Sequence, residues 1–177
     1  MTRAYRQEYR ILAIAPSTRG FGFAVLDNDK RLLDWAGKSV KGDKNSGCMK
    51  KVQQLIVQYQ PEVIVLPDAS AKGSRRSQRI RALCQQLIDA AGTQKIRVGS
   101  FSSLQVRQNL LGNSQVTKHE LAQEITKEFP EELATRLPSK RKPWMSEDHR
   151  MDIFDAVALG LVYLCRRQKR SGENAEQ

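Results

Sequence analysis

Residues 10–26 read RILAIAPSTRGFGFAVL and contain two short apolar runs, 10–15 and 20–26, joined by a connection that begins at Pro16. A short run rich in apolar residues that ends at a proline is typical of a β-strand. A third run follows at 31–40. Three short strands so close together in the chain predict an antiparallel meander.

Helices and strands alternate after the meander. Apolar residues at helical spacing predict a helix at 50–59 and another at about 76–91. EVIVL, at 62–66, is a continuous apolar run of the kind that is buried on both faces in a parallel sheet, and a brief strand follows at 95–98. The order is that of the α/β ribonuclease H-like fold: a mixed five-stranded sheet, with an antiparallel meander plus parallel strands, and helices on both faces.

The remaining third of the chain predicts further helices. Ser102 can cap one helix, and Thr117 with Glu120 forms a capping box at the start of another. The proline-rich stretch 130–143 predicts a loop, and Ser146 is the expected cap of a last helix that runs to about 167. We therefore expect a single domain over 1–168 and a flexible polar tail at 169–177.

The charge balance narrows the class of partner. Lys and Arg number 30 against 19 Asp and Glu, which gives a net charge of +11. Such a surplus favours a polyanion, either nucleic acid or acidic membrane. The longest apolar run, 153–165, contains Asp155 and is too short to span a bilayer, and no signal peptide is expected at the polar N-terminus, so we expect a cytoplasmic protein. The three cysteines are far apart, which predicts free thiols.

Carboxylates suggest where chemistry could occur. Asp152 and Asp155 are one turn apart on the predicted last helix, and His149 extends the same side by a further turn. Asp68 follows the EVIVL strand, at the edge where open α/β sheets place their sites. Three converging carboxylates would make a hard-oxygen site for Mg²⁺ or Mn²⁺. The alternative is structural: an ion pair for the helix acids, and a turn for Asp68.

Basic residues gather in segments. KGSRRSQRIR, at 72–81, has five cations and no acid directly after the EVIVL strand, and a further cluster lies at 136–142. Such segments can follow a phosphate backbone, although a charge run is often only a solvated face. Trp144 is expected in the core with the other aromatic residues, so recognition by DNA shape is favoured over base stacking. The candidate nucleic-acid contacts are Lys72, Arg75, Arg76, Arg79, Arg81, Lys118, Lys140, Arg141 and Lys142.

Four segments together resemble the RuvC family of Holliday-junction resolvases. These are the opening ILAIAPSTRGFGFAVL, then QPEVIVLPDAS, VRQNLLGNSQVTKHELAQEI and DIFDAVALGLVYL, which occur in the family's order and spacing between about residues 10 and 166. The resemblance implies a homodimer that binds four-way junctions and nicks them with four acidic residues and Mg²⁺. It assigns two of those acids to Asp152 and Asp155.

The other two acidic positions depart from the family pattern. Ala15 stands where the family has its first-strand Asp, and Pro67 stands where it has Glu, with Asp68 one step later. Ala15 is either natural or an inactivating replacement, and the second departure favours natural divergence. Asp68 could compensate if a bulge turns it inward.

Three functions remain open from the sequence. The first is a junction-selective, metal-dependent endonuclease that uses Asp68, Asp152 and Asp155 as metal ligands. The second is a nuclease-fold protein that binds branched nucleic acid without cutting it. The third, an actin-like ATPase, is disfavoured because 177 residues supply one lobe where such enzymes need two, and no P-loop is present.

Overall fold

The computed structural model describes residues 8–175, and its five-stranded sheet confirms the predicted fold class. The strand order is β3-β2-β1-β4-β5. The first three strands form the antiparallel meander, and β4 and β5 extend it in parallel. The strands are β1 (Arg10–Pro16), β2 (Gly20–Asp27), β3 (Leu32–Ser39), β4 (Val63–Pro67) and β5 (Arg97–Phe101).

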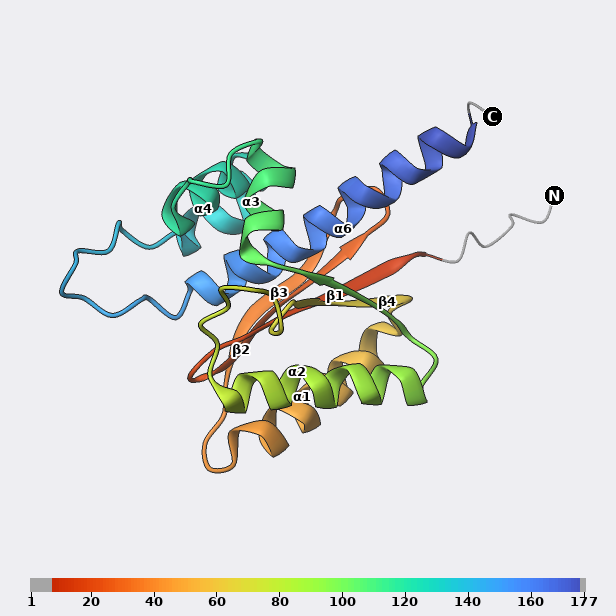
Figure 1. Cartoon of the computed structure of the whole chain (residues 1–177), viewed down its shortest axis with the longest axis horizontal. Helices are drawn as coiled ribbons and strands as arrows, with labels where there is room; N and C mark the ends of the chain where they lie inside the picture. Colours follow the sequence, from red (N-terminus) through yellow and green to blue (C-terminus); the bar gives the residue numbers. More distant parts are fainter. Residues whose placement is uncertain (1–7, 176–177) are drawn as a thin grey trace.

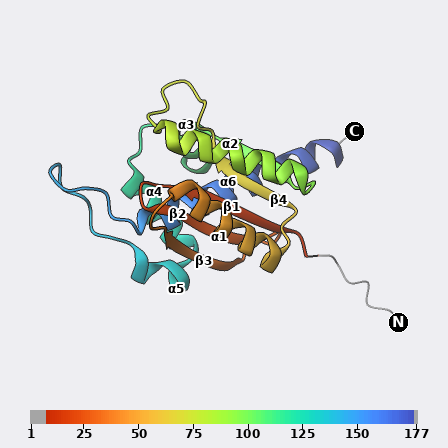
Figure 2. The same ribbon diagram turned by 90° about the horizontal axis from the view of Figure 1, so that it is seen from below.

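Helices cover both faces of the sheet (Figure 1). On one face lie α1 (Lys44–Tyr59) and α2 (Gln78–Thr93). On the other lie α3 (Ser103–Leu111), α4 (Lys118–Glu128) and the long α6 (Met151–Ala175). The view from below shows α1 and α2 in front of the sheet with α6 behind it (Figure 2). A short α5 (Pro130–Leu133) and a 3-10 turn (Ala134–Arg136) follow α4.

Alternation along the buried strands decides which side chains face which helices. In β1, Leu12 and Ile14 pack in the core beneath α1 and α2, whereas Ile11, Ala13 and Ala15 belong to the core beneath α6. β4 follows the same rule: Ile64 and Leu66 belong to the α1 and α2 side, and Val63 and Val65 to the α6 side. The pairing of β4 with β5 continues through Pro67 without a register shift. Pro67 therefore falls on the α6 side, and Asp68 on the opposite one.

Two glycines allow α6 to lie directly on the sheet. Gly22 is paired with Ala15 across the β1–β2 ladder, and a Cβ at Gly22 would lie 2.1 Å from the carbonyl oxygen of Asp152. A Cβ at Gly160 would lie 2.5 Å from a methyl carbon of Leu26. The small residues in β2 and α6 thus fix the first turn of α6 beside the end of β1.

The ends of several helices differ from expectation. α6 begins at Met151, five residues after Ser146, and it continues to Ala175 through most of the segment expected as a tail. α1 begins at Lys44, where Asp43 accepts a hydrogen bond from the Ser46 backbone N–H, and 130–136, expected as loop, is helical. The cysteines are free, as expected. No helix within residues 8–175 is long and apolar enough to cross a membrane.

Candidate nucleic-acid interface

A cleft of about 230 Å³ lies where β1 ends and α4 and α6 begin. Ser17 and Arg19 line it from the β1–β2 connection, Lys118 from α4, and Asp152 and Asp155 from α6. Arg76 also lines the cleft, from the segment before α2. We call this the Lys118 cleft. A larger hollow, about 1060 Å³, lies at the opposite end of the sheet and is lined by none of the predicted site residues.

Lys118 joins two carboxylates within this cleft. Its Nζ lies 2.9 Å from Oε1 of Glu147 and 3.1 Å from Oδ2 of Asp155. The Thr117–Glu120 capping box, which the structure confirms, holds the first turn of α4 and so places Lys118. Burial lowers the pKa of Lys118, but Asp155 and Glu147 outweigh that effect and raise it. The cleft therefore contains a fixed ammonium ion.

The two α6 carboxylates respond differently to this ammonium. Burial raises the pKa of Asp155, and Lys118 opposes the rise. Burial also raises the pKa of Asp152, to about 6; the Ser17 hydroxyl opposes this rise, and the negative charge of Asp155 adds to it. Asp155 is thus the carboxylate with a direct cationic partner. An ion pair was the alternative to metal binding that the sequence left open for Asp155, and its partner in the structure is Lys118.

The positions of the two absent acids meet at a small hollow. Ala15 and Pro67 line it together with Asp155, Lys118 and Arg76, and its volume is about 50 Å³. Their convergence is what the alternation in β1 and β4 requires. At the place where the sequence resemblance would put two carboxylates, the structure has a methyl group and a proline ring.

Asp68 does not join the other two predicted carboxylates. Its Oδ1 accepts hydrogen bonds from the Ser70 backbone N–H, at 3.1 Å, and from the Ser70 hydroxyl, at 2.8 Å. No bulge in β4 turns it toward α6, and it lines neither hollow that contains Asp155. Asp68 is therefore a turn residue, which was the alternative to a metal ligand at this position. The structure therefore brings Asp152 and Asp155 together and keeps Asp68 apart.

These residues do not fit a divalent metal. Mg²⁺ and Mn²⁺ prefer several oxygen ligands and need negative charge around them. Within residues 8–175, no three His, Cys, Asp or Glu side chains are grouped so that they could hold a metal ion. In addition, the Lys118 ammonium already donates to Oδ2 of Asp155, at 3.1 Å. Among the cations of the cleft, Lys118 is paired with Glu147 and Asp155, so Arg76 and Arg19 are the ones that could attract a phosphate.

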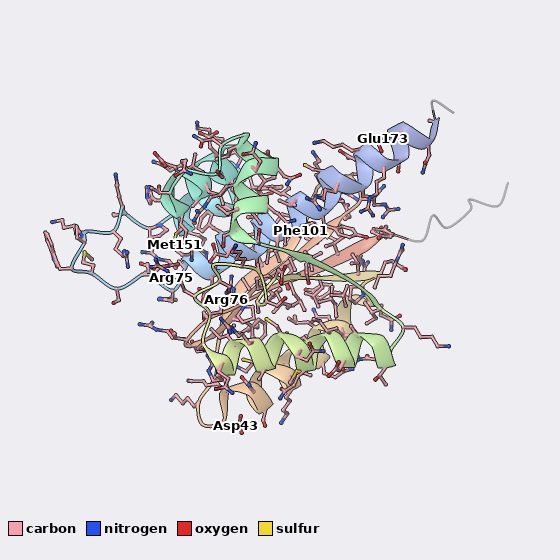
Figure 3. The ribbon with its side chains drawn as sticks, viewed as in Figure 1. Asp43, Arg75, Arg76, Phe101, Met151 and Glu173 are labelled. Carbon is pink, nitrogen blue, oxygen red and sulfur yellow. The ribbon has the colours of Figure 1, made fainter. Side chains whose placement is uncertain are left out.

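The basic segment 72–81 divides into two groups. Lys72 and Arg75 are exposed, and Arg76 lines the Lys118 cleft. Figure 3 labels Arg75 and Arg76, both on the segment before α2, and Met151 at the start of α6. Arg79 is held within the protein, donating to the Ser17 carbonyl oxygen at 2.8 Å and to Asn45 Oδ1 at 3.1 Å. Arg81 donates to the Ser74 carbonyl oxygen at 3.3 Å and remains exposed. Arg79 is thus a structural link between the β1–β2 connection and α1.

The loop over residues 137–150 contains the second group of candidates. Lys140 and Arg141 line a hollow of about 300 Å³ between this loop and the start of α4. Lys142 Nζ lies 5.4 Å from the centre of the Trp144 ring. Trp144 keeps 79% of its surface exposed, so its expected place in the core is wrong. Met145, the next residue, is also exposed, so the two side chains form no buried cluster.

Sequence reasoning missed two groups that help to form the cleft. Glu147 is 29 residues from its partner Lys118, and no local spacing connects them. Arg19 Nη1 lies 3.4 Å from His149 Nδ1, although 130 residues separate the two. His149 precedes α6 rather than extending it. Only the packing of α6 on the β1–β2 connection brings these residues together.

Comparison with known proteins gives one consistent result. No protein-family model matches the chain. Crossover junction endodeoxyribonuclease RuvC from Nitrosomonas eutropha is 24% identical over 162 residues, covering 87% of this chain and 83% of the relative. The protein of the same name from Pseudoalteromonas atlantica is 26% identical over 124 residues, covering 66% of this chain and 72% of the relative.

Solved structures agree in fold. RuvC from Thermus thermophilus matches with a TM-score of 0.65 and 16% identity, over 90% of this chain and 96% of that one. The same enzyme in complex with Holliday junction substrate matches with a TM-score of 0.65 and 15% identity, over 91% and 96%. Ydc2, the yeast mitochondrial Holliday junction resolvase, has a TM-score of 0.58 and 13% identity, over 89% and 78%. The chain is therefore RuvC-like in both sequence and fold, which confirms the resemblance of its four motifs.

Proposed function

We propose that this chain binds four-way junctions and other branched DNA, and that it does so without metal-dependent cleavage. The observation that carries the proposal is the Lys118 cleft itself. In a RuvC-like fold, a lysine ammonium pairs with Asp155, while Ala15 and Pro67 leave two acidic positions without a carboxylate. Such a site retains attraction for phosphate and lacks the ligands that activate a water molecule.

The surface around the cleft supports DNA as the partner. Arg76 and Lys118 lie in it, and Lys72, Arg75 and the cations of the 137–150 loop are exposed on either side. A phosphate backbone that follows the rim would meet these exposed cations, whereas inside the cleft Arg19, Arg76 and Lys118 lie beside Glu147, Asp148, Asp152 and Asp155. The solved RuvC complex, in which that protein binds a Holliday junction, supports a branched form of DNA. The role that we propose is in DNA recombination or repair, in the cytoplasm.

A homodimer is part of the proposal. A four-way junction has two-fold symmetry, and two copies of one chain can present the same cleft and its basic rim to its two equivalent sides. Light scattering of the purified protein, with and without junction DNA, tests this point. We expect the mass of two chains on one junction; a complex with one chain would contradict it.

Binding and cutting can be tested on the same samples. A labelled four-way junction is incubated with the protein in chelator, in Mg²⁺ or in Mn²⁺, and each sample is divided between a native and a denaturing gel. We expect a retarded complex under all three conditions and intact strands throughout. Metal-dependent nicking that is lost in Asp155→Asn would instead support the endonuclease, and the absence of any complex would rule out both functions.

A further inference from the structure

Trp144 lies in a hydrogen-bonded turn. The Met145 backbone N–H donates to the Lys142 carbonyl oxygen at 3.0 Å, which closes a turn with Pro143 and Trp144 at its centre. Proline fixes its own backbone angle at the second position of such a turn. The turn therefore presents the Trp144 ring in a defined direction.

The 137–150 loop that carries this turn is fastened at both ends to the first turn of α4. On one side, a His119 ring nitrogen lies 3.0 Å from the Pro138 carbonyl oxygen. On the other, Lys118 binds Glu147 at 2.9 Å and Asp155 at 3.1 Å. The base of the loop thus belongs to the Lys118 cleft, while its tip extends away from the body of the protein (Figure 1).

An exposed tryptophan in this position is unusual. Tryptophan is among the most buried side chains on average, and its large ring contributes most when it is covered. Trp144 is 79% exposed, and Met145 beside it is 50% exposed. Between residues 138 and 146 the loop has three cations and no acid. This combination suits a flat, uncharged ring surface that is surrounded by phosphates, which is the chemistry of a nucleic-acid base.

We propose that Trp144 stacks on a base at the branch point of bound DNA, an inference that rests on the proposed function. At a branch, the continuous stack of the duplex is interrupted and base faces become accessible. Aromatic side chains that stack on such bases, or enter between them, are a common device in proteins that bind single-stranded or bent DNA. Lys140, Arg141 and Lys142 would contact the neighbouring phosphates. The 137–150 loop would thereby recognise the branch point of the DNA, and the Lys118 cleft would contact the phosphate backbone.

The chain offers a direct reporter because it has two tryptophans, Trp35 and Trp144. In a Trp35→Phe protein, all tryptophan emission comes from Trp144. We expect a four-way junction to quench this emission and a linear duplex of the same sequence to leave it nearly unchanged. Equal quenching by both DNAs would overturn the inference, as would a concentration-dependent change without DNA, because that change would mean that Trp144 packs against a second copy of the chain.

Three variants at this position separate stacking from general apolar contact. Trp144→Ala should bind the junction about tenfold more weakly, the factor that corresponds to ~1.4 kcal/mol of lost stacking. Trp144→Phe should stay within about twofold of the parent because it retains a ring, whereas Trp144→Leu should be as weak as the alanine variant. Duplex affinity and thermal unfolding should be unchanged in all three.

The outcomes distinguish this inference from the function on which it rests. If the parent prefers the junction over duplex and Trp144→Ala retains that preference in full, the stacking role is wrong and the proposed function stands. A leucine variant that binds as tightly as the parent also overturns stacking. If the parent shows no preference for the junction, the proposed function itself fails, whatever the variants do.

Discussion

The Lys118 ammonium lies 3.1 Å from the Asp155 carboxylate, and both residues line the small hollow that also contains Ala15 and Pro67. Asp155 is thus paired with an organic cation, and Ala15 and Pro67, which line the same hollow, supply no carboxylate. Under the proposed function, this arrangement attracts phosphate and lacks the ligands for a reactive water.

Removing the ammonium should expose the mutual repulsion of the carboxylates. Lys118→Met leaves Asp155 and Glu147 without their cation, and because Lys118 is partly exposed we expect a loss of about 1 kcal/mol in the free energy of unfolding. Urea denaturation at pH 7 measures it. The matched control is Lys127→Met on the same helix, whose pair with Glu124 is well exposed, so its change should be smaller. Equal effects in the two variants would show that the Lys118 pairing adds nothing specific.

Asp152 should make stability fall as the pH rises. Its pKa is raised to about 6, so the folded protein holds a proton that the unfolded chain releases near pH 4, and stability declines between about pH 4 and 6. Asp152→Asn removes this decline. We expect the variant to gain about 2 kcal/mol over the parent at pH 7 and almost nothing at pH 4. Thermal unfolding across that range provides the measurement, and a gain independent of pH would contradict the assignment.

Asp148 is a useful contrast to Asp152 because its pKa is lowered rather than raised. Hydrogen bonds from Arg150 lower the pKa of Asp148 to about 2. Its contribution to stability is therefore present above about pH 4 and is lost as the pH falls toward 2. Asp148→Asn should destabilise the protein at pH 7 and approach the parent near pH 2. A gain at pH 7, like that expected for Asp152→Asn, would mean that the two carboxylates had been assigned wrongly.

Arg76 should contact a DNA phosphate, and the salt dependence of binding should report that contact. Arg76→Ala is expected to weaken binding of junction and duplex alike and to lower the salt dependence of the association constant by about one unit on a log–log plot. Arg97→Ala is the control, because Arg97 lies at the start of β5, away from the cleft, and stacks on Tyr9. An unchanged slope for Arg76→Ala, or an equal effect at Arg97, would place the DNA path elsewhere.

Restoring the two absent acids should restore an affinity for metal. In Ala15→Asp with Pro67→Glu, both new carboxylates enter the hollow that contains Asp155. We expect calorimetry to detect Mn²⁺ binding by the double variant and none by the parent. Ala15→Asn with Pro67→Gln supplies similar bulk without charge and should bind no Mn²⁺. Binding of Mn²⁺ by the parent would contradict our conclusion that the residues of this site do not fit a divalent metal.

The sheet and the order of the main helices were predictable because each depends on local pattern, whereas several helix ends and the helical turns at 130–136 were not. The runs RILAIA, GFGFAVL and EVIVL define buried strands, and the Thr117–Glu120 box fixes the start of α4. The placement of Asp68 was not predictable in the same way, since it depends on whether β4 has a bulge. Glu147 was not predictable at all, because its contact with Lys118 spans 29 residues and a loop without regular structure.

Trp144 shows a different limit. Aromatic residues in short chains are usually core, and composition alone gives no reason to exclude one from it. The turn at Lys142–Met145 and the anchoring of the loop to α4 keep the ring exposed. Pro143 is a local signal for the turn, but the contacts that anchor the loop join residues far apart in the chain.

The most direct test is the affinity for a labelled four-way junction in the presence of chelator, measured by fluorescence anisotropy with unlabelled linear duplex of the same sequence as competitor. Without metal ions, the Lys118 cleft and its basic rim must supply the attraction. We predict that the junction is bound at least tenfold more tightly than the duplex under these conditions. Equal affinity for the two DNAs, or junction binding that appears only after Mg²⁺ or Mn²⁺ is added, would contradict the account.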